Sequence, residues 1–220
     1  MIKAIIFDSD GTLYDQTHEF IELTHDTLDC FLAEYLCVPK KEATIKRKSL
    51  AMKYGANLIG VVKGLGLPWE KVYEVTYANA PIETRVKQNP EFALILNSLP
   101  QRKIVLTNNT TRFTKSVLKR VGIVGCFERI IGADLFGFEL KPNEAPYLCA
   151  LKYFNGTRPE EILFVEDRAE NLVPARKLGM QTCYLGSNAG AVCDYRIQTI
   201  ENIKEVVTTE KFINMQYGIL

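Results

Sequence analysis

Two carboxylates are spaced two residues apart near the N-terminus, in the segment Asp8-Ser9-Asp10-Gly11-Thr12. The apolar run of residues 4–7 comes just before them and is typical of a short buried strand. Open α/β sheets bind their ligands at the carboxyl ends of the strands, so this position suits a site. There Asp8 and Asp10 could act as a nucleophile and a general acid, or as metal ligands. A plain Asp-Gly turn is the alternative interpretation.

A second polar cluster, Thr107-Asn108-Asn109-Thr110, follows the apolar run of residues 103–106 and precedes a helical pattern. Hydroxyl, amide and backbone N–H groups that converge at the start of a helix can hold an anion. The alternative is that Asn109 or Thr110 only caps the helix.

One lysine and two adjacent acids complete the set. Lys141 precedes a proline, which favours an extended backbone, so its side chain could reach into a crevice or simply lie on the surface. Glu166 and Asp167 end a third apolar run, where acids are costly to gather unless a cation is present, although Asp167 could merely cap the next helix. Carboxylates for a hard divalent cation, with a lysine and a hydroxyl for an oxyanion, are the groups that phosphoryl transfer needs.

The elements that must position these groups alternate along the chain. Short β-branched or aromatic runs alternate with helical patterns, which is typical of a parallel sheet. Two of the expected helices, residues 110–121 and 169–178, each stop at a glycine. We therefore predict an α/β fold with a Rossmann-like parallel sheet. Its expected strands are residues 4–7, 103–106, 129–131, 162–165, 182–185 and 194–197.

Between the first two strands this alternation fails, because the chain there has helical patterns and no convincing strand. A direct crossover needs only about a dozen residues. The surplus predicts an all-helical insertion of residues 16–90, which leaves residues 1–15 and 91–220 for the core. The expected helices are residues 20–35, 41–54 and 69–77, with residues 91–99 as the return path.

Composition limits the partners. The 220 residues carry 27 Lys and Arg against 26 Asp and Glu, a formal charge of +1, and so provide no broad field for nucleic acid or for an anionic membrane. The first apolar run is cut by Asp8 and is too short for a signal peptide. The six cysteines form no CxxC pair, which favours reduced thiols. We expect a cytoplasmic monomer or homodimer without nucleic-acid or membrane partners.

Four motifs in order resemble those of the haloacid dehalogenase (HAD) superfamily of phosphohydrolases. They are Phe7-Asp8-Ser9-Asp10-Gly11-Thr12-Leu13, Thr107-Asn108, Lys141-Pro142 and Glu166-Asp167. The resemblance spans about residues 2–206 and implies that the insertion is a helical cap domain. Only 34 residues separate Thr107 from Lys141, which leaves no room for the superfamily's alternative, later cap.

The resemblance also implies the chemistry. Asp8 would attack phosphorus to give an aspartyl-phosphate. Asp10 would protonate the leaving alcohol and then activate the water that hydrolyses the intermediate. Thr107 and Asn108 would bind the transferring phosphoryl group, and Lys141 would neutralise charge on it and on Asp8.

By the same resemblance, Mg²⁺ is the cofactor. The Asp8 carboxylate, the Asp10 main-chain carbonyl and Asp167 would hold it, with Glu166 nearby or acting through water. Gly11 would allow the tight turn of the first motif and is counted among the substrate-binding residues.

Within the superfamily, Thr12-Leu13-Tyr14, the approach Leu99-Pro100 and Asn171 look most like pyrimidine 5′-nucleotidases. The expected substrate is a small phosphorylated metabolite, with a nucleoside 5′-monophosphate as one candidate. Asn171 could orient Lys141 or the loop of the fourth motif, or face solvent. Substrate selection would fall to polar residues within apolar stretches of the cap, for which Lys53, Tyr54, Asn57 and Arg85 are the candidates.

Three other functions use the same scaffold. A sugar-phosphate phosphomutase would need the same catalytic residues, so the motifs alone do not separate it from a phosphatase. Dehalogenases of the superfamily lack the second aspartate, and Asp10 therefore argues against them. A non-catalytic regulatory protein would have lost an essential residue, whereas this chain retains them all.

Overall fold

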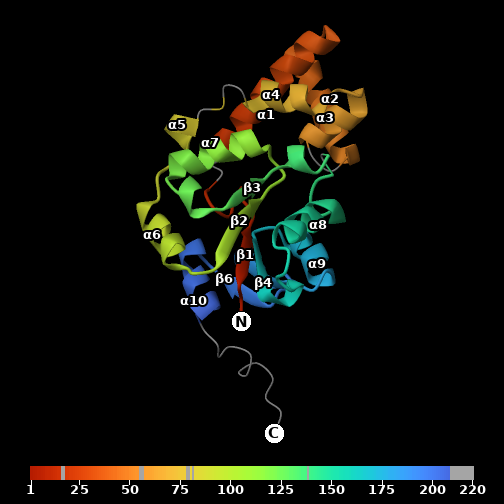
Figure 1. The fold of residues 1–220 in the computed structure, drawn as a ribbon. Helices are drawn as coiled ribbons and strands as arrows, with labels where there is room; N and C mark the ends of the chain where they lie inside the picture. The colour runs from red at the N-terminus through yellow and green to blue at the C-terminus, as the bar shows by residue number, and fades with distance from the viewer. Residues whose placement is uncertain (16–17, 55–56, 78–79, 81, 138, 209–220) are drawn as a thin grey trace. The chain divides into compact units, whose positions relative to one another are not determined.

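A computed structural model describes residues 1–15, 18–54, 57–77, 80, 82–137 and 139–208. The chain divides into two compact units (Figure 1). One consists of Met1–Asp15 and Lys87–Leu220, and the other of Gln16–Val86. We had expected the return to the core at residue 91; residues 87–90 belong instead to the first unit.

A parallel sheet of six strands forms the first unit, in the order β3-β2-β1-β4-β5-β6. This confirms the predicted α/β class. The chain crosses over in both directions from β1, so the carboxyl ends of β1, β2 and β4 meet at one edge, where such sheets bind ligands. The strands are β1 (Ala4–Phe7), β2 (Arg102–Leu106), β3 (Arg129–Ile131), β4 (Ile162–Glu166), β5 (Gln181–Leu185) and β6 (Tyr195–Ile197).

Helices cover both faces of this sheet (Figure 1). Alternate residues of a strand point to opposite faces; Ile6 and Phe164 pack with Tyr147 and Leu172 of the helices α8 and α9 on one side. The neighbouring side chain Ile5 is equally buried on the other, which explains why these strands are apolar throughout. The helices of this unit are α6 (Pro90–Ser98), α7 (Thr111–Val121), α8 (Glu144–Tyr153), α9 (Ala169–Lys177) and α10 (Ile203–Thr208).

Helix α7 shows how local sequence fixes the boundaries next to the site. The Thr110 side chain accepts a hydrogen bond from the backbone N–H of Phe113 and caps the helix. Gly122 ends it with a φ of 93°, which a residue with a Cβ rarely adopts. The helix therefore starts immediately after the polar cluster that follows β2.

The second unit is helical in its described residues and has its own core, built by Leu28, Leu32, Val61 and Val72 among others. Its helix α3 was missed by the sequence analysis because two glycines interrupt its apolar pattern. A Cβ on Gly60 would lie 2.7 Å from the Leu50 backbone, so this glycine permits close packing against α2. The helices are α1 (His18–Leu36), α2 (Lys40–Tyr54), α3 (Asn57–Leu65), α4 (Trp69–Tyr77) and α5 (Ile82–Arg85).

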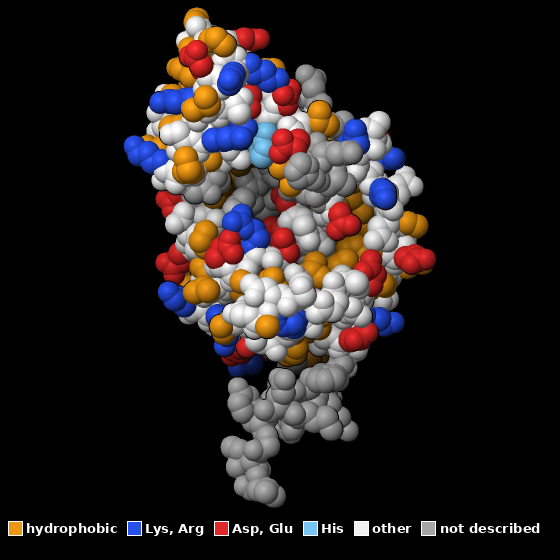
Figure 2. Space-filling view, turned by 180° about the vertical axis from the view of Figure 1, so that it is seen from behind, with side chains coloured by type: hydrophobic (Ala, Val, Ile, Leu, Met, Phe, Trp, Pro, Cys, Tyr) orange, Lys and Arg blue, Asp and Glu red, His pale blue; other side chains and the backbone are white. Residues whose placement is uncertain are grey.

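Charge is mixed on the surface. Figure 2 shows Lys and Arg side chains interspersed with Asp and Glu over one face of the molecule. Among the described helices, none has the length and apolar character that crossing a membrane requires.

Candidate active site

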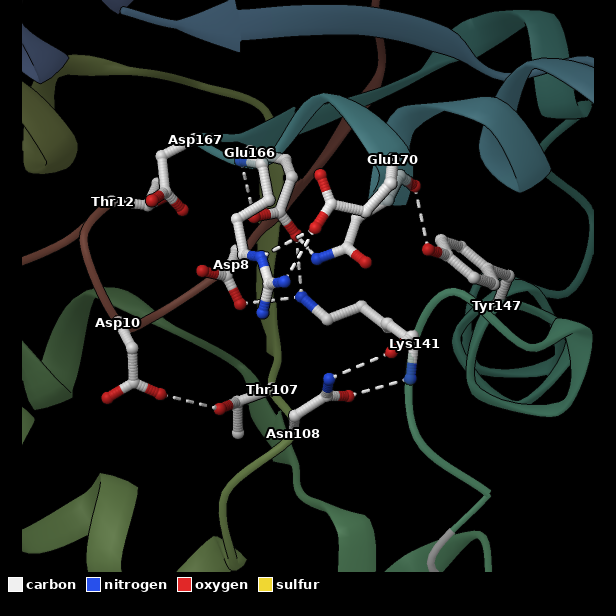
Figure 3. Close-up of polar contacts among 12 residues, drawn as sticks. Asp8, Asp10, Thr12, Thr107, Asn108, Lys141, Tyr147, Glu166, Asp167 and Glu170 are labelled. Atoms are coloured by element: carbon white, nitrogen blue, oxygen red, sulfur yellow. Dashed lines mark hydrogen bonds and ion pairs between the residues drawn. The ribbon is translucent and has the colours of Figure 1, made fainter. Parts of the chain in front are cut away.

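Asp8 and Lys141 form a buried ion pair at the carboxyl end of β1 (Figure 3). The Asp8 backbone N–H donates to the Val165 carbonyl at 2.9 Å, which extends the β1–β4 ladder to the carboxylate. The Lys141 Nζ lies 2.6 Å from the Asp8 Oδ1 and 2.8 Å from the Glu166 Oε2. One ammonium group thus joins two carboxylates from neighbouring strands.

Burial and charge shape the ionisation of this pair. Burial raises the pKa of Asp8 well above its ordinary value, and Glu166 adds to this, whereas Lys141 opposes it. Burial disfavours the ammonium form of Lys141, but Asp8 and Glu166 outweigh it and raise its pKa. Lys141 therefore remains charged near neutral pH and can neutralise an oxyanion beside Asp8.

Asn108 positions Lys141 through its side-chain amide. The amide Nδ2 donates to the Lys141 carbonyl at 3.0 Å, and the amide Oδ1 accepts from the Lys141 backbone N–H at 2.7 Å. These two bonds link the loop after β2 to the loop carrying the lysine. Binding of the phosphoryl group by Asn108 stays a prediction.

Glu166 occupies a fully buried position at the end of β4, supported on several sides. Its Oε2 accepts from the Asn171 Nδ2 at 2.9 Å, and its Oε1 accepts from the Arg168 backbone N–H at 3.1 Å. Asn171 is buried, so it faces this network and not solvent. Asn171 holds Glu166, and Glu166 in turn holds Lys141.

Three carboxylates could share a metal ion. Asp8, Glu166 and Asp167 each offer an oxygen within 4.8 Å of the others, and oxygen ligands suit Mg²⁺. Burial, followed by Glu166, raises the pKa of Asp167 to about 7. Lys141 alone balances less negative charge than these carboxylates bring, and the residues present therefore fit a divalent cation.

Gly11 allows the first loop to approach Asp167. Its φ is 85°, and a Cβ at this position would lie 2.5 Å from the Asp167 Oδ2. The adjacent Thr12 hydroxyl donates to the Asp167 Oδ1 at 3.2 Å. Gly11 and Thr12 therefore orient the fourth motif from across the crevice, beyond the turn expected from the sequence.

Asp10 and Thr107 face one another on the side of Asp8 away from Asp167 (Figure 3). The Thr107 hydroxyl donates to the Asp10 Oδ2 at 3.3 Å. Thr107 also accepts the Asn109 backbone N–H at 3.0 Å, which fixes its hydroxyl in the loop after β2. A hydroxyl and a carboxylate thus flank the buried nucleophile candidate.

Two further contacts to Asp10 were not expected from the sequence. The Tyr14 hydroxyl donates to the Asp10 Oδ1, and the Asn109 Nδ2 donates to the Asp10 Oδ2 at 2.8 Å. The available signals were weak: Tyr14 follows Asp10 by four residues, and Asn109 was expected either to belong to an anion-binding cluster or to cap the helix, which Thr110 does.

The four expected specificity residues all belong to the second unit. The Lys53 ammonium lies 5.1 Å from the centre of the Tyr54 ring, and Arg85 is an exposed residue of α5. The Asn57 Oδ1 accepts from the Arg47 Nη1 at 2.8 Å, a contact within this unit. Substrate selection by these residues stays a prediction.

Comparison with known proteins points to one family. A model for haloacid dehalogenase-like hydrolases matches residues 2–179. Glyceraldehyde 3-phosphate phosphatase of Methanocaldococcus jannaschii is 28% identical over 230 residues, covering 96% of this chain and 99% of that protein. Phosphoglycolate phosphatase of Aquifex aeolicus is 26% identical over 188 residues, covering 82% and 83%.

The chain is also similar to a protein named as a dehalogenase and to a solved phosphatase structure. Haloacetate dehalogenase H-2 of a Moraxella species is 25% identical over 236 residues, covering 94% of this chain and 98% of that protein. A HAD phosphatase structure from Thermococcus onnurineus superposes with a TM-score of 0.71 at 20% identity, covering 94% and 98%. This second likeness shows the shared fold.

Proposed function

The chain belongs to the haloacid dehalogenase-like hydrolases, and on this basis we propose that it is a Mg²⁺-dependent phosphatase of a small phosphate monoester. The proposal rests on one observation above all: Asp8 is buried against Lys141, with Asp10 two residues away and separately hydrogen-bonded. A nucleophile and an acid or base are thus held apart by different contacts.

In the first step an Asp8 oxygen attacks phosphorus, and the bond from phosphorus to the ester oxygen breaks. Asp10 in its acid form gives its proton to that oxygen, so the alcohol leaves neutral. Lys141 neutralises charge on the transferring group, and the Thr107 hydroxyl binds one of its oxygens.

In the second step water attacks phosphorus of the aspartyl-phosphate. Asp10, now a carboxylate, takes the proton from water, and the bond between phosphorus and the Asp8 oxygen breaks. Inorganic phosphate leaves and both aspartates return to their starting forms. Mg²⁺, held by Asp8, Asp167 and the Asp10 main-chain carbonyl with Glu166 nearby, would supply charge neutralisation at the phosphoryl oxygens.

The relatives suggest a short phosphorylated substrate. Two of those named above are called phosphoglycolate phosphatase and glyceraldehyde 3-phosphate phosphatase, so small anionic or sugar phosphates are the first candidates. A nucleoside 5′-monophosphate is a further candidate, supported by the likeness of Thr12-Leu13-Tyr14 to pyrimidine 5′-nucleotidases.

Dehalogenation is the competing reaction, since one relative is named a haloacetate dehalogenase. It displaces halide from carbon, so its first step leaves no alcohol for Asp10 to protonate. The three hydrogen bonds that converge on Asp10 support phosphoryl transfer.

The test is phosphate release from a panel of phosphoglycolate, triose and hexose phosphates and nucleoside monophosphates. We expect release with Mg²⁺ and none with EDTA, and chloroacetate should release no chloride. Asp8→Asn should abolish turnover, whereas Asp10→Asn should lower it by about 10²-fold or more. Full activity of Asp8→Asn would exclude the mechanism, and activation by a sugar bisphosphate would favour the phosphomutase alternative.

A further inference from the structure

Asp10 receives hydrogen bonds on both of its carboxylate oxygens from residues outside the four motifs. Tyr14, in the same loop, donates to Oδ1. Asn109, after β2, donates to Oδ2 at 2.8 Å, beside the longer 3.3 Å contact from the Thr107 hydroxyl. The carboxyl group is therefore held from two separate segments of the chain.

The backbone keeps both donors in place. The Gly11 N–H donates to the Tyr14 carbonyl at 3.1 Å, which closes the loop that carries Asp10 and Tyr14. Asn109 is buried, and its carbonyl accepts from the Ala133 N–H at 2.8 Å. The contacts named here involve neither Asp8 nor Lys141.

We propose that Tyr14 and Asn109 are positioning residues that hold the Asp10 carboxyl group for both of its proton transfers. This inference rests on the proposed phosphatase function. The two residues act through Asp10 and are not themselves catalytic.

The two donors differ in a way that suits a group that both gives and takes a proton. A tyrosine hydroxyl can donate or accept, so Tyr14 can stay bonded to Oδ1 whether Asp10 is a carboxylate or an acid. The amide nitrogen of Asn109 only donates, so Oδ2 remains an acceptor.

Two substrates of nearly the same shape separate the proton-transfer role from a structural one. p-Nitrophenolate is a weak base and leaves phosphorus without a proton, whereas phenolate is a stronger base and needs one. If the Asp10 carboxyl group is no longer held in place, phosphorylation of Asp8 by phenyl phosphate should therefore slow more than phosphorylation of Asp8 by p-nitrophenyl phosphate. Dephosphorylation, which needs Asp10 as the base, should slow equally with both.

The variants are Tyr14→Phe, which removes only the hydroxyl, and Asn109→Ala. Each should lower kcat for phenyl phosphate by about 10-fold or more and leave KM within about threefold, because substrate binding is not the function of these residues. With p-nitrophenyl phosphate each should show a rapid burst of one p-nitrophenol per enzyme before slow turnover, as the aspartyl-phosphate accumulates.

Matched controls lose the same groups elsewhere in the same unit. Tyr195→Phe removes a hydroxyl that donates to Gln181, and Asn202→Ala removes an amide that donates to Glu205. Both should keep wild-type kinetics. If Asn109→Ala fails to fold, as judged by thermal melting, Tyr14→Phe alone decides the question.

Equal losses with the two substrates and no burst would overturn the inference, and so would wild-type kinetics in both variants. Either result would leave the phosphatase proposal intact. Failure of the wild-type protein to hydrolyse any phosphate ester would instead contradict the proposed function on which the inference rests.

Discussion

At Gly11 a single missing side chain lets the first and fourth motifs meet. A Cβ there would lie 2.5 Å from the Asp167 Oδ2, and the residue's positive φ adds backbone strain for any other amino acid. We expect Gly11→Ala to displace Asp167 and to weaken activation by Mg²⁺ by about 10-fold or more, a cost of roughly 1.4 kcal/mol. Phosphate release titrated with Mg²⁺ measures this.

Gly156→Ala is the matched control for backbone strain. Its φ is 88°, close to that of Gly11, and no atom lies within 4 Å of the position of its Cβ. Gly156→Ala should lower the melting temperature through backbone strain, and it should not change the Mg²⁺ dependence of phosphate release. Equal Mg²⁺ responses in the two variants would show that Gly11 acts only through the backbone.

The carboxyl group of Asp167 links stability to pH and to metal. Its pKa is about 7 in the fold, above the ordinary 3.8, so folding favours its neutral form. Its contribution to the free energy of unfolding therefore falls as pH rises from about 4 to about 7 and stays unfavourable above that range. Asp167→Asn removes this titration.

We therefore expect metal-free Asp167→Asn to gain melting temperature relative to the wild type at pH 8, and to gain less at pH 5. At pH 8, Mg²⁺ should raise the melting temperature of the wild type more than that of the variant, because binding stabilises the folded state. Scanning fluorimetry with EDTA or Mg²⁺ measures both effects. A difference between the proteins that does not vary with pH would contradict this account of Asp167.

Site residues that belong to the motifs could be predicted from the sequence. Residues that only contact a motif residue were harder to predict. Asp8 and Asp167 were candidate site residues because each directly follows an apolar run, and the roles predicted for them and for Lys141 came from the resemblance to the superfamily. The role of Asn109 could not be predicted, because a polar residue just before a helix can serve as a cap or take part in a site. Its contact with Asp10 depends on how the loops after β1 and β2 lie in the fold.

At the scale of elements, a buried ion pair joins α1 to α2 in the second unit. The Arg47 Nε lies 2.6 Å from the Asp29 Oδ1, and the Thr44 hydroxyl donates to the other carboxylate oxygen at 2.9 Å. Arg47 lies in a stretch rich in Lys and Arg, residues 40–48, yet it is buried. Periodicity does not reveal this, since a charged residue on the inner face needs a partner on another helix.

Truncating this pair should be costly. Asp29→Ala leaves the Arg47 guanidinium buried without its counter-charge, and we expect a loss of about 3–5 kcal/mol in the free energy of unfolding. The double variant Asp29→Leu/Arg47→Met should recover most of that loss. Urea unfolding measures both, and a double variant as unstable as Asp29→Ala would argue against an electrostatic cause.

The strands were predictable as elements because both faces of the sheet are buried and each strand is therefore a continuous apolar run. Helix α3 (Asn57–Leu65) was not, because its glycines lower helix propensity. Gly60 nevertheless sits against Leu50 of α2, so packing between helices outweighs local preference there.

At the scale of the whole molecule, the charges nearly cancel at +1, and both signs mix on the face shown in Figure 2. Attraction of an anionic substrate must then come from the site and not from a long-range field. We expect kcat/KM to change by no more than about threefold between low salt and physiological salt at fixed Mg²⁺. A steep fall with salt would reveal electrostatic steering.

The division into a sheet unit and a helical unit could be predicted from the sequence, because residues 16–99 contain no strand pattern. The boundary at Val86 did not, since helical patterns continue into α6 of the core. Substrate identity was equally inaccessible, because the motifs encode the reaction and not the leaving group.

The central claim is that Asp8 carries the phosphoryl group during turnover. Acid quenching of the enzyme during hydrolysis of p-nitrophenyl phosphate with Mg²⁺, followed by peptide mass spectrometry, tests this directly. We predict one phosphoryl group on Asp8, labile to hydroxylamine and enriched in Asp10→Asn, whose dephosphorylation is slowed. Steady turnover with no phosphorylated Asp8 in either protein, or with the phosphoryl group on another residue, would contradict the account.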